Sequence, residues 1–295
     1  MNLILKNKDI IMRKILLPTD FSENAFNALK YAVELFKYEK SEFILLHAYA
    51  DEVYNNGTLV SEEIFEELKT AAERISRSQL DMILNKIKEL SPNPKHSFTT
   101  IAAFGALVDE ANEIINQENI DLAVMGTRGK TNDRQLTFGT NTIQVIKYVQ
   151  SPVLCIPEDY NYKTPKQILF PTNFLIPYQR RELKLLADLA RSYRSEIHML
   201  YISNFPIKSY RQKDNQMFLK EEFADDIFNF HRVPEGEKTK VILDHIDSMK
   251  IDMLVMVRSR HTYLENIIQE STVDKIGLHP KIPFLVFQNY YRAIL

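Results

Sequence analysis

The chain has 295 residues, enough for two domains, and its hydrophobic content of 45% and charged content of 26% are typical of globular proteins. Its formal net charge is −2 and it has no long basic run, which argues against nucleic acid or an anionic membrane as the main partner. A single cysteine, the lack of an apolar stretch of membrane-helix length, and a mixed-charge tail over residues 1–11 together predict a cytoplasmic protein.

The first predicted elements alternate between apolar strands and amphipathic helices. Residues 14–17 form a short apolar strand, and the motif Pro-Thr-Asp-Phe-Ser at residues 18–22 follows as a turn whose serine is a good helix N-cap. Residues 23–38 carry apolar side chains at helical spacing, and residues 43–48 form a second strand. A long polar insertion comes next, and residues 59–90 within it predict a charged amphipathic helix.

The same alternation continues to the middle of the chain. Residues 98–103 predict a third strand and residues 107–117 a helix. Leu122–Met125 has the continuous apolar character of a strand that is buried on both faces, and residues 151–156 predict a fifth strand. Strands that alternate with helices predict a parallel sheet with helices on both faces.

A glycine-rich loop joins the fourth strand to the next helix. Gly126, Gly129 and Gly139 lie in this segment, although the whole chain has only seven glycines. The helix is predicted to begin at Thr140, with a Thr or Asn side chain as its cap. Glycines allow the backbone to approach a ligand closely, and a helix N-terminus attracts anions, so this segment predicts a phosphate site. A plain strand-to-helix turn is the alternative interpretation.

The pattern of the first half of the chain begins again in the second half. Residues 168–174 repeat residues 15–21 at an offset of 153, and residues 251–256 repeat residues 120–125 at an offset of 131. The offset falls because the second copy lacks much of the long helix. One α/β unit therefore occurs twice. The sequence predicts a tail, a first domain, a linker and a second domain over residues 1–11, 12–158, 159–165 and 166–291.

The Pro-Thr-Asp-Phe-Ser strand end, together with the later Gly-x2-Gly-x9-Gly-Thr loop, resembles the universal stress protein family. The chain looks like a tandem member, with a strong resemblance over residues 12–158 and a weaker one over residues 166–290. The resemblance implies an α/β fold of two tandem flavodoxin-like (adenine nucleotide α-hydrolase-like) domains, each a five-stranded parallel sheet with helices on both faces. Members are often homodimers, so the tandem chain is expected to form a built-in pseudo-dimer through its last strands.

In the ATP-binding branch of that family the nucleotide lies over the carboxyl ends of the strands, as in other open α/β sheets. The resemblance implies a site for ATP, or for AMP or ADP, with or without Mg²⁺. The base and ribose would lie at the ends of the first, second and fourth strands, and the phosphates on the glycine loop and the start of the next helix. The residues so implied are Thr19, Asp20, Ala48, Met125, Gly126, Gly129, Gly139, Thr140 and Asn141. Asn141 departs from the family pattern, which commonly has a small apolar residue there.

The second copy has lost the features of this site. Val257, Arg260 and Glu270 stand where the first copy has its three loop glycines, and Glu270 would place a carboxylate where a phosphate should lie. Counting 153 residues onward from Ala48 reaches Tyr201. We therefore expect nucleotide to bind in the first domain only.

Three functions remain open on the sequence. The first is an adenine-nucleotide-binding regulatory or stress-response protein. The second is a slow ATPase or a nucleotide-transferring enzyme, although the sequence identifies no catalytic residue beyond the loop residue Asp133. The third is a scaffold whose second domain and 59–90 helix contact a protein partner. A metal site built by the protein is not expected, because the histidines and carboxylates lack ligand spacing, and Cys155 and His47 are expected to lie in the core.

Overall fold

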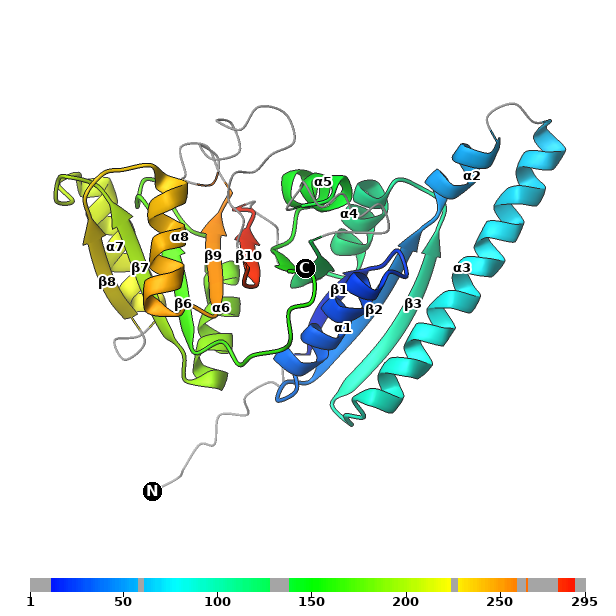
Figure 1. Cartoon of the computed structure of the whole chain (residues 1–295), viewed down its shortest axis with the longest axis horizontal. Helices are drawn as coiled ribbons and strands as arrows, with labels where there is room; N and C mark the ends of the chain where they lie inside the picture. The colour runs from blue at the N-terminus through cyan, green and yellow to red at the C-terminus, as the bar shows by residue number, and fades with distance from the viewer. Residues whose placement is uncertain are drawn as a thin grey trace, which may run out of the picture.

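The structure is a computed structural model that describes residues 12–57, 61–127, 138–223, 228–258, 264 and 281–289. Within these ranges ten strands form one continuous sheet, with helices on both of its faces (Figure 1). The strands are β1 Arg13–Pro18, β2 Ser41–Ala48, β3 His96–Ala103, β4 Leu122–Gly126, β5 Val153–Ile156, β6 Gln167–Pro171, β7 Glu196–Ile202, β8 Phe228–Val233, β9 Met253–Val257 and β10 Phe284–Phe287. The helices are α1 Glu23–Leu35, α2 Ala50–Gly57, α3 Glu62–Leu90, α4 Leu107–Gln117, α5 Thr140–Tyr148, α6 Arg180–Tyr193, α7 Tyr210–Phe223 and α8 Lys238–Met249. None of these helices has both the length and the apolar content that crossing a membrane requires.

The strand order is β3-β2-β1-β4-β5-β10-β9-β6-β7-β8. Each half of the chain contributes five parallel strands in the same relative order, which confirms the predicted fold class. The halves meet through β5 and β10, which pair antiparallel with Cys155 opposite Phe284 and Val153 opposite Val286. In Figure 1, β10 lies in the middle of the molecule, between β9 and the first-half strands.

The hydrophobic core has two layers, one on each face of the sheet. Successive side chains of a strand point to opposite faces, so Leu17 of β1 packs in one layer and Leu16 in the other. Helices α1, α3, α6 and α7 cover the first face, and α4, α5 and α8 cover the second. Each layer contains residues from both halves, so the core is continuous across the β5–β10 junction.

All the elements predicted for the first half are present, and the structure adds one helix in the polar insertion. Ser22 caps α1 as expected, because its hydroxyl accepts a hydrogen bond from the Ala25 N–H at 3.1 Å. The helix predicted over residues 59–90 is α3, whose N-terminal Ser61 accepts from the Ile64 N–H. The pattern did not reveal α2, a helix of only eight residues that packs against α3.

The turn that follows the first strand is built in the same way in both halves. The Thr19 hydroxyl accepts a hydrogen bond from the Phe21 N–H at 3.0 Å, and the Thr172 hydroxyl accepts one from the Phe174 N–H at 3.1 Å. Both phenylalanines adopt left-handed backbone conformations, with φ of 64° and 55°. Such a conformation is uncommon for a bulky residue. Its recurrence indicates that the two halves share the local design of the strand end and not only the order of their strands.

The hydrogen bonds also fix how the second strands of the two halves correspond. The Thr19 N–H donates to the Leu46 carbonyl of β2, and the Thr172 N–H donates to the Leu200 carbonyl of β7, both at 2.9 Å. The offset between β2 and β7 is therefore 154 (200 − 46), not the 153 that relates β1 to β6. The second half has one more residue between its first two strands.

This register corrects one prediction. Ile202, not Tyr201, occupies the position of Ala48, because both residues end their strands at the same offset of 154. Tyr201 corresponds to His47 instead. The two residues also share a contact, since each ring packs against the phenylalanine of its turn, Phe21 or Phe174.

An arginine joins the two halves at a second place. Arg181, in the first turn of α6, donates to the Asn119 side chain and carbonyl, to the Ile120 carbonyl and to the Asp121 carboxylate, at 2.5 to 3.2 Å. These acceptors lie between α4 and β4 of the first half. Bidentate and branched contacts of this kind suit the fixed geometry of a guanidinium group.

We expect Arg181→Ala to lower the free energy of unfolding by about 1.5–3 kcal/mol, because it leaves several partly buried acceptors without a donor. Arg180→Ala is the matched control. Its side chain is 78% exposed and pairs with Glu222, so it should change the free energy by no more than about 0.5 kcal/mol. Urea unfolding followed by circular dichroism measures both. Equal effects of the two substitutions would contradict this account of Arg181.

Candidate functional site

The first candidate crevice lies where the carboxyl ends of β1 and β4 adjoin. The chain leaves β1 toward β2 on one side, whereas β4 pairs with β1 on the other, so the direction of strand addition reverses between them. Ligands of open α/β sheets bind in the crevice at such a switch point. All the sequence-predicted site residues except Gly129 lie in the described ranges, at the ends of β1, β2 and β4 and at the start of α5. Gly129 and Asp133 lie outside the described residues.

The turn after β1 holds its polar side chains through local hydrogen bonds. One oxygen of the Asp20 carboxylate accepts from the Ser22 N–H at 3.1 Å, and the Thr19 hydroxyl accepts from the Phe21 N–H. Both Thr19 and Asp20 are partly exposed. The Phe21 ring packs on the His47 ring, with 4.3 Å between centroids. The turn therefore presents a positioned carboxylate and hydroxyl at the crevice.

His47 supports this turn from the end of β2. It is buried, its Nδ1 lies 2.8 Å from the Ser76 hydroxyl of α3, and its Nε2 lies 3.4 Å from the Glu52 carboxylate of α2. It is thus a hydrogen-bonded core histidine, as the sequence suggested. The following residue, Ala48, ends β2 and is partly exposed at the same edge of the sheet.

Gly126 ends β4 where the first turn of α1 approaches it closely. A Cβ atom at this position would lie 2.7 Å from Asn24 Nδ2 and 3.1 Å from the Asn24 carbonyl oxygen. Contacts as close as 2.7 Å do not occur between a real Cβ and another heavy atom, so a side chain here must displace Asn24. The packing of α1 on β4 is therefore a reason for this glycine that does not depend on a ligand.

The start of α5 differs from the prediction. Gly139 is the N-cap, and no side chain caps the helix, so the expected Thr or Asn cap is wrong. The Gly139 N–H donates to the Thr127 carbonyl at 2.7 Å, so in this structure it is not available to a ligand. The Thr142 hydroxyl, which the sequence reasoning missed, contacts the Gly126 and Thr127 carbonyls at 3.0 and 3.1 Å. Thr142 thereby fixes the start of α5 against the end of β4.

The first turn of α5 has the properties of an anion site. The N–H groups of its first residues have no carbonyl acceptor within the helix, and the helix dipole makes this end positive. Thr140 and Asn141 are exposed there, whereas Thr142 is buried. A phosphate could therefore meet the exposed turn at Thr140 and Asn141, next to the end of β4.

The single cysteine is a core residue and is not exposed at the candidate site. Cys155 is in the middle of β5 and is fully buried. Burial raises the pKa of its thiol well above the ordinary value, so the thiol stays protonated and unreactive. This agrees with the expected packing role.

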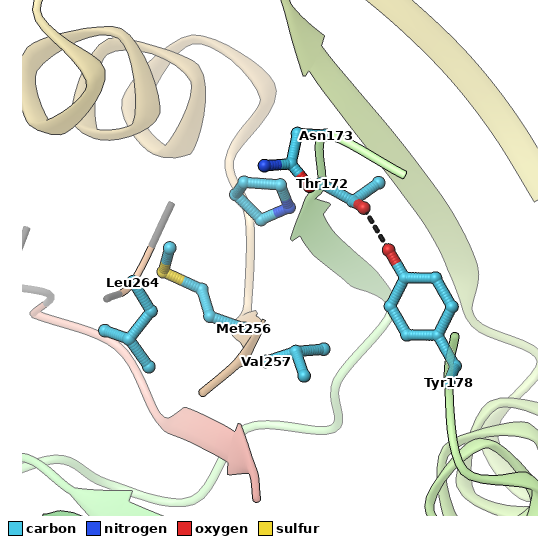
Figure 2. A pocket seen from close by; sticks show the side chains of 7 residues that line it. Thr172, Asn173, Tyr178, Met256, Val257 and Leu264 are labelled. Atoms are coloured by element: carbon cyan, nitrogen blue, oxygen red, sulfur yellow. Dashed lines mark hydrogen bonds between the residues drawn. The ribbon is translucent and has the colours of Figure 1, made fainter. Parts of the chain in front are cut away.

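A small pocket occupies the corresponding place in the second half, between the carboxyl ends of β6 and β9 (Figure 2). Its volume is about 220 Å³, open solvent included. Val257 stands at the position of Gly126, since both residues end their strands at an offset of 131. The residues that line the pocket are Pro171, Thr172, Asn173, Tyr178, Met256, Val257 and Leu264.

Comparison with known proteins finds a family for residues 12–157 and a similar fold for both halves. A model of the universal stress protein family matches residues 12–157. A universal stress protein of Methanocaldococcus jannaschii is 31% identical over 160 residues, which are 50% of this chain and 96% of that protein. A second one from the same organism is 26% identical over 162 residues, 53% of this chain and 88% of that protein. The crystal structure of a universal stress protein from Archaeoglobus fulgidus is similar over 94% of this chain and 96% of its own, with a TM-score of 0.64 and 19% identity, so the fold is alike across both halves.

We expect Gly126→Ala to lower the free energy of unfolding by about 1–3 kcal/mol, because the new methyl group overlaps the Asn24 amide. The same substitution in an Asn24→Ala background should cost clearly less. A double-mutant cycle from chemical unfolding measures this coupling. An equal cost in both backgrounds would show that Asn24 is not what requires a glycine.

Proposed function

Because the chain belongs to the universal stress protein family, we propose that it is a nucleotide-binding regulatory protein of the stress response that holds ATP in its first half. The nucleotide occupies the crevice between β1 and β4. The Asp20 carboxylate and the Thr19 hydroxyl meet the ribose and base, with the Ala48 backbone and Met125 beside the base. The phosphates meet the N-terminus of α5.

The observation that carries this proposal is the meeting of two different polar groups at one switch point. A carboxylate suits ribose hydroxyls, which donate hydrogen bonds to it, and a helix N-terminus suits phosphates. Asp20 follows β1 and Thr140 begins α5, while Thr142 ties α5 to the end of β4. One molecule that has both hydroxyl groups and phosphates, such as a nucleotide, matches this pair of groups.

We further propose that the halves are tandem copies of one domain, over residues 12–158 and 166–291, and that their junction at β5 and β10 takes the place of a homodimer contact. Only the first copy binds nucleotide. Asn173 and Val257 replace Asp20 and Gly126 in the second, which removes the carboxylate and adds a side chain at the crevice. The proposed location is the cytoplasm.

A protein-binding role is the second candidate, and α3 is the feature that favours it. This helix has 29 residues, and only Ser76, Leu80 and Ile87 are buried. Its apolar residues Ile75 and Met82 are 52% and 68% exposed. Such a surface could contact a partner protein whose binding depends on whether the first half holds nucleotide. ATP hydrolysis by this chain also stays a prediction, which a turnover assay with ATP and Mg²⁺ tests.

Purified protein should contain or bind one adenine nucleotide per chain, as measured by mass spectrometry of the extract and by calorimetry with ATP, ADP and AMP. Gly139→Glu should weaken ATP binding by about two orders of magnitude or more, because it sets a carboxylate against the phosphates. The φ of −64° at Gly139 is open to any residue, so the variant should fold. Gln144→Glu adds the same charge to an exposed position further along α5 and is the control. Absence of any nucleotide binding by the unmodified chain would refute the proposal.

Asp20→Asn should lower ATP affinity about tenfold by removing a charged acceptor for the ribose hydroxyls. The turn should survive, since Asn173 in the second half accepts the Leu175 N–H in the same way that Asp20 accepts the Ser22 N–H. Calorimetry gives the affinity and thermal unfolding gives the stability. Unchanged affinity would place the ribose elsewhere.

A further inference from the structure

The pocket in the second half lies at the second switch point of the sheet. There β6 adjoins both β7 and β9, as β1 adjoins both β2 and β4 in the first half. Thr172 and Asn173 follow β6, while Met256 and Val257 end β9 (Figure 2). The pocket therefore corresponds in position to the proposed nucleotide crevice.

A longer loop brings a tyrosine to this crevice. Helix α1 begins five residues after Pro18 (23 − 18), whereas α6 begins nine residues after Pro171 (180 − 171). The extra length contains Tyr178, which is 7% exposed. Its hydroxyl is hydrogen-bonded to the Thr172 hydroxyl (Figure 2). Its ring packs edge-on against Phe170, with 5.9 Å between the ring centroids.

The threonine at the strand end is buried and bonded to this tyrosine in the second half, unlike its counterpart in the first half. Thr172 is buried, and its hydroxyl bonds both to the Phe174 N–H and to Tyr178. Thr19 at the equivalent position is partly exposed, and within the described residues its side chain bonds only to the N–H of its own turn. The groups that face a ligand in the first half are thus covered by the chain itself in the second.

We infer that Tyr178, together with Val257, closes the second crevice, and that this closure helps to restrict nucleotide to the first half. The space that remains between these side chains is about 220 Å³ with open solvent included. Val257 is 5% exposed and lines the pocket at the position that Gly126 has in the first half. The inference rests on the proposed function for the identity of the excluded ligand, but the closure itself is independent of it.

Cysteine labelling tests the closure because the native thiol, Cys155, is buried. Thr19→Cys and Thr172→Cys place one thiol at equivalent positions of the two crevices. We expect a thiol reagent to modify Thr172→Cys about tenfold more slowly than Thr19→Cys, since reaction requires access. Adding Tyr178→Ala should raise the rate at Thr172→Cys to near that at Thr19→Cys. Equal rates while Tyr178 is present would overturn the inference.

The control for general loosening is Tyr193→Ala, which removes a buried tyrosine at the end of α6 that does not line the pocket. If it raises labelling at Thr172→Cys as much as Tyr178→Ala does, the closure is not due to Tyr178. Should Thr172→Cys fail to fold, Val257→Cys reports on the same pocket with the same expected rates.

Repeating the labelling with ATP separates the two proposals. ATP should slow the reaction at Thr19→Cys and leave the rate at Thr172→Cys unchanged. Protection of both thiols to the same extent would overturn the closure of the second crevice. Protection of neither would count against nucleotide binding in the first half, while the rates without ATP would still decide the role of Tyr178.

Discussion

The antiparallel pairing of β5 with β10 is the contact on which the rest of the molecule depends. Both strands are short and entirely buried, and without each other they would be exposed apolar edges. Their pairing satisfies the backbone groups and joins the core layers on both faces of the sheet. Because β5 and β10 run in opposite directions, their carboxyl ends point to opposite ends of the sheet. Each crevice is therefore formed by the strands of its own half.

Within this shared scaffold, the halves differ in the helices that follow their second strands, α2 and α3 against α7, and in the loops at their strand ends. The strand ends, the left-handed phenylalanines and the threonine-capped turns are alike. What differs is the residue that each half places over the end of its fourth strand. Asn24 lies close to Gly126 in the first half, whereas a longer loop brings Tyr178 to the pocket beside Val257 in the second. Loops can change in this way because their residues are not constrained by the sheet.

The sequence was sufficient to predict the parallel α/β fold and the strands of the first half, at whose ends the candidate residues lie, because strand ends and apolar runs are local signals. It was not sufficient to predict the correspondence of Ala48 with Ile202, since one additional residue before β7 leaves no visible mark on the pattern. Thr142 was missed for a related reason. Its hydroxyl has carbonyl partners that come together only when α5 docks on β4.

Gly126 and Gly139 lie in the same segment, but the structural reasons for a glycine differ between the two positions. The contact with Asn24 is one reason for a glycine at position 126, so Val257 at the corresponding position does not by itself show that a ligand site was lost. Gly139 is different, because its φ of −64° is accessible to every residue. Nothing in its backbone conformation demands a glycine, and its N–H is already bonded to Thr127. The functional argument for the loop therefore rests on the positive end of α5 beside Gly139, and a carboxylate at that position is the change that separates a site for phosphate from a plain turn.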